Sequence, residues 1–143
     1  MNSLPAMRPT VRRNVVFHRH DDVTGMSIPV PVELIYYRGD PYAVHLMFKP
    51  GQDTSRDVRW VVSRDLLAAG TFAPTGEGDV QVEPAGIRVN IRLSNPGMSA
   101  RFSVAGHMLD RFLDDTFLLV SQGSEAAEYD LDSALDALLD GAA

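Results

Sequence analysis

The sequence predicts an α+β fold in which about seven strands form antiparallel sheets and helices pack on them. Two observations support this class. Apolar and polar residues alternate in seven short stretches that are separated by turn residues, and the apolar period becomes helical twice, which gives the order strands, helix, strands, helix. The chain has 143 residues and no cysteine, so one sizeable core is expected without disulfide bonds.

The first half contains four stretches with the alternation expected of sequential antiparallel strands. They cover residues 13–20, 28–36, 42–48 and 58–62, and turn residues separate the later ones. Pro29 and Pro31 cannot donate hydrogen bonds to a neighbouring strand, so the start of the second strand is expected at a sheet edge or in irregular geometry. Four such strands in succession predict a meander.

A short helix is expected directly after the fourth strand. Ser63 is a suitable N-cap, residues 65–69 continue the helix, and Gly70 occupies the position typical after a helix C-terminus. Residues 72–79 then predict a loop. Three further strands are expected at residues 80–82, 87–93 and 98–104, the last two joined by the turn Asn95-Pro96-Gly97.

Two longer helices are expected in the last third of the chain. Ser103 is predicted to cap the first, which should end near Thr116 because Asp114 and Asp115 oppose the helix dipole. Asp130 is predicted to cap the second, whose apolar residues have helical spacing: Leu131, Ala134, Leu135 and Leu138. An isolated helix of this length is unstable in water, so we expect it to dock on its own domain.

Composition limits the possible functions. A net charge of −6 and a pI near 5.0 make nucleic acid an unlikely partner, because such binding depends on contacts from basic residues to phosphates. The chain has no apolar run long enough for a signal peptide or a membrane span, so a cytoplasmic protein with only indirect membrane contact is expected. We expect a flexible N-terminal tail at residues 1–11 and a single domain at residues 12–140.

Candidate catalytic and metal-binding residues are few. His18, His20 and Asp22 have a spacing that could begin a metal site, but a solvated strand face is the simpler interpretation. The glycines of residues 75–79 are not followed by the Lys-Ser/Thr of a phosphate loop, and no serine lies in a nucleophile-elbow motif. We therefore expect no catalytic residue, no metal ion and no cofactor.

Two groups of residues are candidates for partner binding. Arg88, Arg92 and Arg101 lie on neighbouring strands and predict a basic patch for an anionic partner, either a protein or single-stranded nucleic acid, although a solvated outer face is the default. Phe117, Leu118 and Leu119 belong to an apolar stretch, residues 117–120, that is expected to form a loop in need of a covering partner.

Three stretches have an order and spacing that resemble the SsgA-like proteins of sporulating actinobacteria. They are Asp40-Pro-Tyr-Ala-Val-His-Leu-Met-Phe48, residues 63–80 with Ser63-Arg-Asp-Leu-Leu-Ala-Ala-Gly70, and Tyr129-Asp-Leu-Asp132. The similarity extends from about Asn14 to Leu139. The motif residues are interpreted as architectural, since a capping serine and turn glycines shape the backbone.

The resemblance implies a fold like the whirly type and a non-enzymatic adaptor that controls septum placement during sporulation and cell division. It implies a cytoplasmic protein recruited to division septa, with the tubulin-like protein FtsZ or another SsgA-like protein as partner. It also implies a homo-oligomer, plausibly a trimer. The alternative function is a single-stranded nucleic-acid-binding module, which the implied fold and the three arginines would support.

Overall fold

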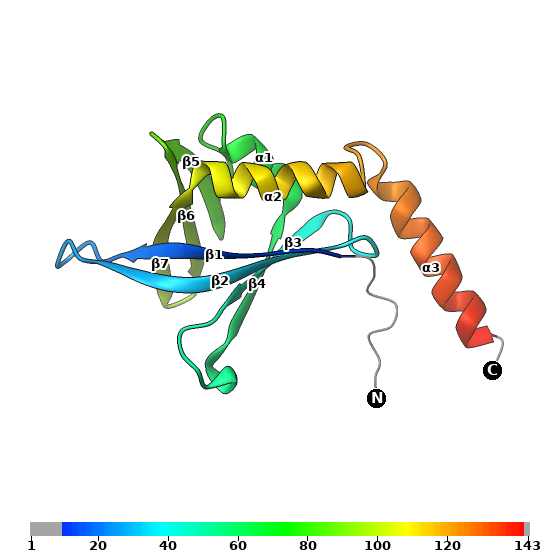
Figure 1. The fold of residues 1–143 in the computed structure, drawn as a ribbon, viewed down its shortest axis with the longest axis horizontal. Coiled ribbons are helices and arrows are strands. Elements are labelled where there is room, and N and C mark those ends of the chain that lie inside the picture. Colours follow the sequence, from blue (N-terminus) through cyan, green and yellow to red (C-terminus); the bar gives the residue numbers. More distant parts are fainter. Residues whose placement is uncertain (1–9, 142–143) are drawn as a thin grey trace.

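The computed structural model describes residues 10–141 as one seven-stranded antiparallel sheet with three α-helices (Figure 1). Along the sheet the strand order is β4-β3-β2-β1-β7-β6-β5. The strands are β1 (Thr10–His20), β2 (Ser27–Tyr37), β3 (Ala43–Phe48), β4 (Val58–Ser63), β5 (Val80–Ala85), β6 (Arg88–Asn95) and β7 (Met98–Ala105). The helices are α1 (Arg64–Gly70), α2 (Gly106–Leu119) and α3 (Glu125–Gly141), with a 3₁₀ turn η1 (Thr54–Arg56). The predicted α+β class, strand number and element order are confirmed.

The sheet consists of two halves that share a short seam. β1 and β2 pair along their whole length, whereas β1 pairs with β7 only over His18–His20. Beyond that seam the halves diverge, and β5, β6 and β7 stand at a steep angle to β1 and β2 (Figure 1). α2 runs beside β1 and contacts β6 and β7, so it packs against both halves.

The core lies between the two halves and α2. Phe17, Phe48 and Phe102 form an aromatic cluster whose ring centroids are 4.9–6.2 Å apart. Leu109 and Phe112 of α2 are fully buried against it. Aromatic side chains in such a core contribute large buried apolar areas, so this cluster helps to hold the two halves together.

The strand predictions agree closely with the structure. β3 pairs with β2 only over Val32–Ile35. The start of β2, which contains Pro29 and Pro31, therefore lies beyond the β3 register, at an edge of the sheet, as its prolines predict. β1 starts earlier than predicted: Thr10 and Val11, expected to belong to the N-terminal tail, are part of this strand. The rest of the predicted tail, residues 1–9, lies outside the described residues.

The prediction for α1 is confirmed, with a different role for its glycine. Ser63 caps the helix because its Oγ accepts a 3.1 Å hydrogen bond from the Leu66 N–H. Gly70 is the last residue of the helix rather than the residue after it. A Cβ atom at Gly70 would lie 2.3 Å from Cγ1 of Val82, so glycine is needed here for the close approach of α1 to β5.

The predicted bounds of α2 are wrong at both ends. Ser103 does not cap the helix, because it lies inside β7, opposite Asn90 of β6. The helix continues past Thr116 to Leu119, so the apolar stretch expected to form a loop is mostly its last turn. Two cations offset the unfavourable dipole: Arg13 pairs with Asp115, and the Arg64 guanidinium donates to carbonyl oxygens at the helix C-terminus.

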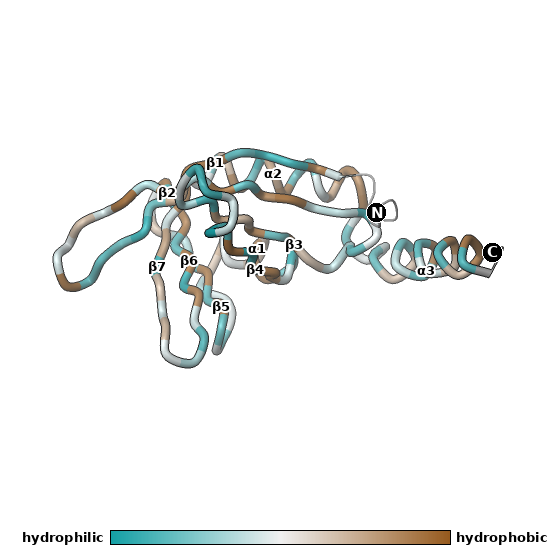
Figure 2. The backbone as a smooth tube through the Cα atoms, turned by 90° about the horizontal axis from the view of Figure 1, so that it is seen from below, coloured by the Kyte–Doolittle hydropathy of each residue, from teal (hydrophilic) through white to brown (hydrophobic). Residues whose placement is uncertain are grey.

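Two predictions for α3 are wrong: its start at Asp130 and the docking of its apolar side on its own domain. The helix begins at Glu125, five residues before the predicted cap, and it extends away from the sheet in both views (Figures 1 and 2). Its outward-facing apolar side chains stay exposed: Leu131 by 57%, Leu138 by 69% and Leu139 by 71%. Among the described residues no helix combines the length and apolar composition that a membrane span requires.

Candidate functional site

The three predicted arginines gather on one face of β6 and β7. Arg92 lies directly opposite Arg101 in the register of these strands, and Arg88 lies four residues before Arg92 on the same side of β6. His18 and His20 of β1 join them, since they pair with Ser103 and Arg101 of β7. We call this surface, made by Arg88, Arg92, Arg101, His18 and His20, the arginine face.

One part of the arginine face is held by internal hydrogen bonds. The Arg88 guanidinium donates to the Ser103 hydroxyl at 2.9 Å, to the Ser103 carbonyl at 3.1 Å and to Nδ1 of His18 at 3.0 Å. Nε2 of His20 lies 2.8 Å from the same hydroxyl. Ser103 is buried, so these contacts fix both histidines and Arg88 in place.

In the other part, Arg101 has an acidic partner and Arg92 has none among the described residues. Arg101 donates a 2.7 Å hydrogen bond to the exposed carboxylate of Asp22, which holds the pKa of Asp22 below its ordinary value. Arg92 donates only a 3.3 Å hydrogen bond to the Ser99 hydroxyl and forms no ion pair within residues 10–141. Like charges directly opposite each other on neighbouring strands are destabilising, so this arrangement favours an anion beside Arg92.

Two hollows flank the Arg92–Arg101 pair. The first, of about 300 Å³, lies toward the turn between β1 and β2 and includes Arg19, Val23 and Ile28. The second, of about 260 Å³, lies toward β5 and the preceding loop. Both are lined by Arg92 and Arg101, and neither is lined by a Phe, Tyr or Trp side chain. The surface therefore combines guanidinium groups with aliphatic side chains, and the carboxylates of Asp21 and Asp22 line the first hollow and that of Glu83 the second.

The possible metal site at His18, His20 and Asp22 does not assemble. His18 contacts Arg88, His20 contacts Ser103, and Asp22 pairs with Arg101. Within the described part of the chain no group of three or more His, Asp or Glu residues is arranged to hold a metal ion. The pKa of His20 is lowered by burial and then by the positive charges of Arg101 and Arg88, and these charges also work against a cation there.

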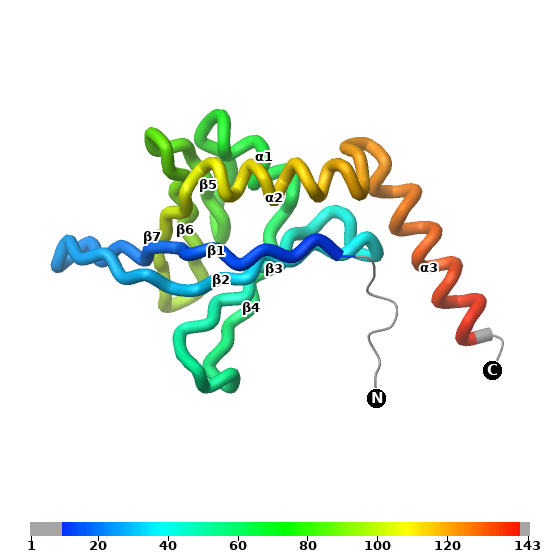
Figure 3. Tube along the Cα trace, in the orientation of Figure 1, coloured from blue at the N-terminus to red at the C-terminus, as the bar shows by residue number. Residues whose placement is uncertain are grey.

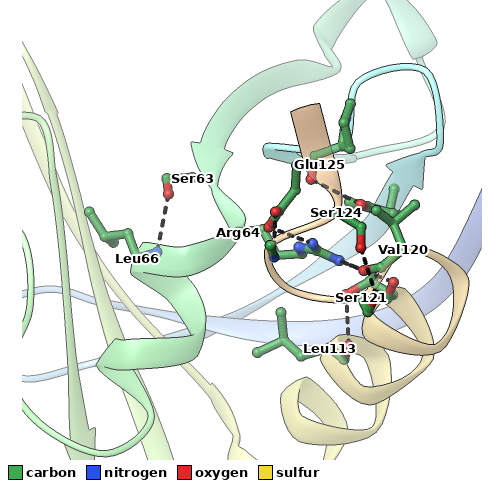
Figure 4. A network of polar contacts seen from close by, with 12 residues as sticks. Ser63, Arg64, Leu66, Leu113, Val120, Ser121, Ser124 and Glu125 are labelled. Atoms are coloured by element: carbon green, nitrogen blue, oxygen red, sulfur yellow. Dashed lines mark hydrogen bonds and ion pairs between the residues drawn. The ribbon is translucent and has the colours of Figure 1, made fainter. Parts of the chain in front are cut away.

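A second polar centre surrounds Arg64 (Figure 4). Its side chain is fully buried, and its guanidinium donates to the carbonyl oxygens of Thr116 at 3.1 Å and Val120 at 2.8 Å. It also pairs with the Glu125 carboxylate at 2.9 Å and lies 4.2 Å from the centroid of the Phe117 ring. One side chain thus joins the start of α1, the end of α2 and the start of α3.

The surroundings of Glu125 favour its charged form, which pairs with Arg64. Burial alone would raise the pKa of Glu125, but hydrogen bonds from its own N–H, from Arg64 and from Gly123 outweigh that effect and lower it. Burial raises the pKa of Tyr36, which also contacts Arg64, to about 12. The sequence pattern did not identify Arg64 as a candidate, although it contains a signal. Arg64 directly follows the N-cap Ser63, where a positive charge opposes the helix dipole, and this unfavourable position indicates that the side chain has a distant partner.

The three candidate residues at the end of α2 differ in their exposure. Phe117 packs on Arg64 and is half-buried, and Leu119 is also half-buried. Leu118 is 85% exposed. The structure does not bring these residues together with the arginine face, which lies beyond the opposite end of α2 (Figure 1). Only Leu118 presents most of its side chain to a partner.

α3 combines exposed apolar residues with acidic ones. Glu125 and Glu128 pair with Arg64 and Arg38, the latter at 3.8 Å. Further along, the helix carries acidic residues that form no ion pair within the described residues: Asp130, Asp132, Asp136 and Asp140. From Glu125 to Asp140 the sequence has no basic residue, so α3 is an acidic helix with an uncovered apolar side.

Comparison with known proteins gives consistent matches. Residues 30–125 match the family model described as "Streptomyces sporulation and cell division protein, SsgA". The sporulation-specific cell division proteins SsgB of Kineococcus radiotolerans and Streptomyces coelicolor are each 42% identical, over 81% and 79% of this chain and 72% and 84% of theirs.

Two solved structures have the same fold. An SsgA-like sporulation-specific cell division protein from Thermobifida fusca superposes with a TM-score of 0.82 at 32% identity, covering 95% of this chain and 98% of that one. A structure from work on SsgB and longitudinal cell division in Streptomyces coelicolor gives a TM-score of 0.79 at 37% identity, covering 85% and 97%.

Proposed function

The chain belongs to the SsgA family of sporulation and cell-division proteins, and from this premise we propose that it is a non-enzymatic adaptor that controls where septa form during sporulation. Its relatives are named for cell division during sporulation, and these names support a role of this chain in that process. The proposal adds that the protein acts by contacts with the division machinery, at the septum and from the cytoplasm.

The observation that carries the proposal is the uncovered apolar side of α3. Leu131, Leu138 and Leu139 are each more than half exposed on a helix that leaves the domain. Exposed apolar surface of this kind marks a protein contact, and a helix of this length gains stability mainly by packing against something. A protein that presents such a helix is suited to hold other proteins together.

The proposed partners are division proteins, either of the tubulin-like FtsZ type or another SsgA-like protein. Besides the apolar side of α3, two surfaces are available for them. Leu118 presents an exposed apolar side chain near the corner between α2 and α3, and the arginine face presents Arg92 and Arg101 beyond the opposite end of α2. Surfaces at two ends of the molecule allow two proteins to be bound at once, as an adaptor requires.

The non-enzymatic part of the proposal is supported by the contacts of the polar residues. Arg88, His18 and His20 are occupied by mutual hydrogen bonds around buried Ser103. The guanidinium of the buried Arg64–Glu125 pair is occupied by the Glu125 carboxylate and by the carbonyl oxygens of Thr116 and Val120. Both groups therefore have a structural explanation that needs no substrate.

Single-stranded nucleic acid is the second candidate ligand, and one observation favours it. Arg92 and Arg101 expose positive charge on a sheet surface, which such proteins use to follow a phosphate backbone. They also use aromatic side chains on which bases stack, and neither hollow beside these arginines is lined by Phe, Tyr or Trp. The net charge of −6 further weakens this candidate.

Cells that lack the protein test the proposal directly. We expect a deletion strain to form misplaced or too few sporulation septa, and a fluorescent fusion to localise at septa. Division proteins should co-purify with the tagged full-length chain. Normal septa in the deletion strain together with diffuse fluorescence would reject the adaptor function. Salt-sensitive binding of the purified protein to single-stranded oligonucleotides would favour the second candidate instead.

A further inference from the structure

We infer that the outer edge of β4 is a docking site for an extended peptide of another protein, which adds a further strand to the sheet beside Arg59 and Val61. The inference deepens the proposed function by naming a contact of a different kind, made by the backbone. It rests on that function only in that the peptide belongs to a protein partner.

The backbone of β4 has hydrogen-bonding groups that no neighbour uses. β4 is the last strand at one edge of the sheet, and within residues 10–141 it pairs with β3 alone. The Arg64 N–H donates to the Tyr42 carbonyl at 2.8 Å, and in an antiparallel pair such bonded positions alternate. Every second residue of β4 therefore bonds to β3, whereas the N–H and C=O groups of Arg59 and Val61 point away from the sheet.

The opposite edge of the sheet is protected in a way that β4 is not. At β5, Thr75 forms two backbone hydrogen bonds with Val82, of 2.8 and 2.9 Å. Pro84, the next residue whose backbone points outward, has no N–H to offer. β4 contains no proline, and no described residue forms a hydrogen bond with the outward groups of Arg59 or Val61. An edge strand without such protection is a template for pairing with another chain.

The outer edge of β4 is also accessible. In Figures 1 and 3 the hairpin formed by β3 and β4 projects from the rest of the domain, with η1 near its tip. Arg59 is exposed, and Val58 and Val61 are 48% and 52% exposed. This part of β4 therefore presents both its side chains and its outer backbone to solvent.

The side chains of β4 determine which peptide fits. Arg59 and Val61 lie on the face of the sheet away from buried Val62. The Arg59 guanidinium donates a 3.3 Å hydrogen bond to Nδ1 of His45, which holds it against β3, and it forms no ion pair within the described residues. Pairs of opposite charge and pairs of β-branched residues stabilise neighbouring strands. A carboxylate opposite Arg59 and a β-branched side chain opposite Val61 are therefore favoured.

Two acidic residues flank this edge, and neither lies directly opposite the expected carboxylate. Asp57 precedes the strand, is half-buried and follows exposed Arg56, and Asp65 belongs to the first turn of α1. Like charges destabilise neighbouring strands when they are directly opposite, so Arg59 sets the charge preference. Antiparallel pairing is the more stable arrangement, and it places the β-branched residue of the peptide two positions before the acidic one.

A display library of random peptides of about nine residues, selected on the full-length chain, supplies the probe. We expect the selected peptides to share a β-branched residue two positions before Asp or Glu. In NMR hydrogen exchange, the amides of Arg59 and Val61 should exchange fast in the free chain and become protected in the complex. Those of Trp60 and Val62 should be protected in both. A library without binders, or binders that leave Arg59 and Val61 unprotected, would overturn the inference.

Val61→Pro tests the role of the backbone. It removes one outward N–H and leaves the hydrogen bonds between β4 and β3 in place, as proline on an edge strand can. It should weaken binding of a selected peptide about tenfold or more. Val61→Ala is the matched control, because it shortens the side chain but keeps the N–H, and it should bind far better than Val61→Pro. Equal binding by the two variants contradicts the inference.

Arg59→Glu tests the charge preference and does not depend on the folding of the proline variant. It should bind the acidic peptide more weakly and prefer a peptide in which Lys replaces the acidic residue. Arg111→Glu, at an exposed position on α2, should change neither affinity. Circular dichroism checks that each variant is folded. An unchanged preference for the acidic peptide in Arg59→Glu would reject the predicted pairing.

A second copy of the chain is the alternative occupant of this edge. If light scattering shows that Val61→Pro lowers the oligomeric state of the chain, the edge joins copies and the inference is wrong. An unchanged oligomeric state supports a peptide of another protein. Septum formation in cells is a separate readout, so a failure of the adaptor function is distinguishable from a failure of this inference.

Discussion

The guanidinium of Arg64 and the carboxylate of Glu125 form a 2.9 Å ion pair in which both side chains are almost completely buried, with exposures of 0% and 7%. The two residues are 61 positions apart in the chain. Removing one partner of such a pair leaves the other buried without compensation, which is far more costly than losing a surface ion pair.

Arg64→Ala should therefore lower the free energy of unfolding by about 3–5 kcal/mol, measured by urea denaturation at pH 7. The substitution also removes the donors to the carbonyl oxygens of Thr116 and Val120. Arg111→Ala, an exposed arginine of α2, is the matched control and should change stability by less than about 0.5 kcal/mol. Equal effects of the two substitutions would show that the buried pair has no special role.

The same pair predicts a pH dependence of stability. The pKa of Glu125 is lowered in the folded state from 4.5, so its contribution is fully present above about pH 4.5 and is lost as the pH falls through the folded-state pKa. Glu125→Gln should thus cost most at pH 7, and its difference from the wild type should shrink in unfolding experiments at pH 4 and below. Glu77→Gln is the control, since Glu77 makes no hydrogen bond within the described residues. A difference for Glu125→Gln that is constant over this range would contradict the prediction.

Gly70→Ala should destabilise the protein by about 1–3 kcal/mol in the same assay, because its Cβ would collide with Val82. Val82→Ala in the Gly70→Ala background should recover part of that loss by removing the colliding methyl groups. Gly51→Ala, where an added Cβ meets no atom within 4 Å, should be nearly neutral. The prediction fails if Gly70→Ala is as mild as Gly51→Ala.

The imidazole of His20 should titrate below its ordinary pKa of 6.5, which NMR of the side chain can measure. Burial is the largest cause, followed by the charge of Arg101. Arg101→Gln should raise the pKa of His20, because it removes a neighbouring positive charge and leaves the favourable charge of Asp22. Arg111→Gln, on α2, should leave the titration unchanged. A His20 pKa that does not respond to Arg101→Gln would mean that these arginines do not create a positive potential at β1.

Leu118→Glu should leave the free energy of unfolding within about 0.5 kcal/mol of the wild type, since its side chain is 85% exposed. If Leu118 contacts a division protein, the same substitution should reduce co-purification of that protein with the tagged chain. Ile87→Glu is the control, because Ile87 is 91% exposed near the other end of α2. Undiminished co-purification with Leu118→Glu would remove Leu118 from the proposed surface.

The sequence predicts the strands well because the alternation of apolar residues directly reflects one buried face. Arg88, Arg92 and Arg101 were found in this way, as alternate residues on neighbouring strands. The helix ends were predicted less well, because they depend on contacts between distant residues. Arg13 and Arg64 allow α2 to continue beyond Asp115, and neither contact is visible in a local pattern.

The apolar spacing of α3 correctly predicts a helix but does not say what the helix packs against. Its leucines would suit a core as well as an interface. Only the position of α3, away from the sheet and fixed at its start by Arg64, shows that its own domain leaves them exposed. The pairing of Arg92 with Arg101 also depends on strand register, which the sequence does not determine by itself.

The seam between β1 and β7 has a mechanical consequence. Within residues 10–141, the strands of the two halves pair only over the three residues His18–His20 of β1, and α2 packs against both halves. A force that pulls the two halves apart would therefore act on this seam and on the packing of α2. The seam has the shortest register between neighbouring strands of the sheet, so such a force should separate the two halves before either half loses its own strands.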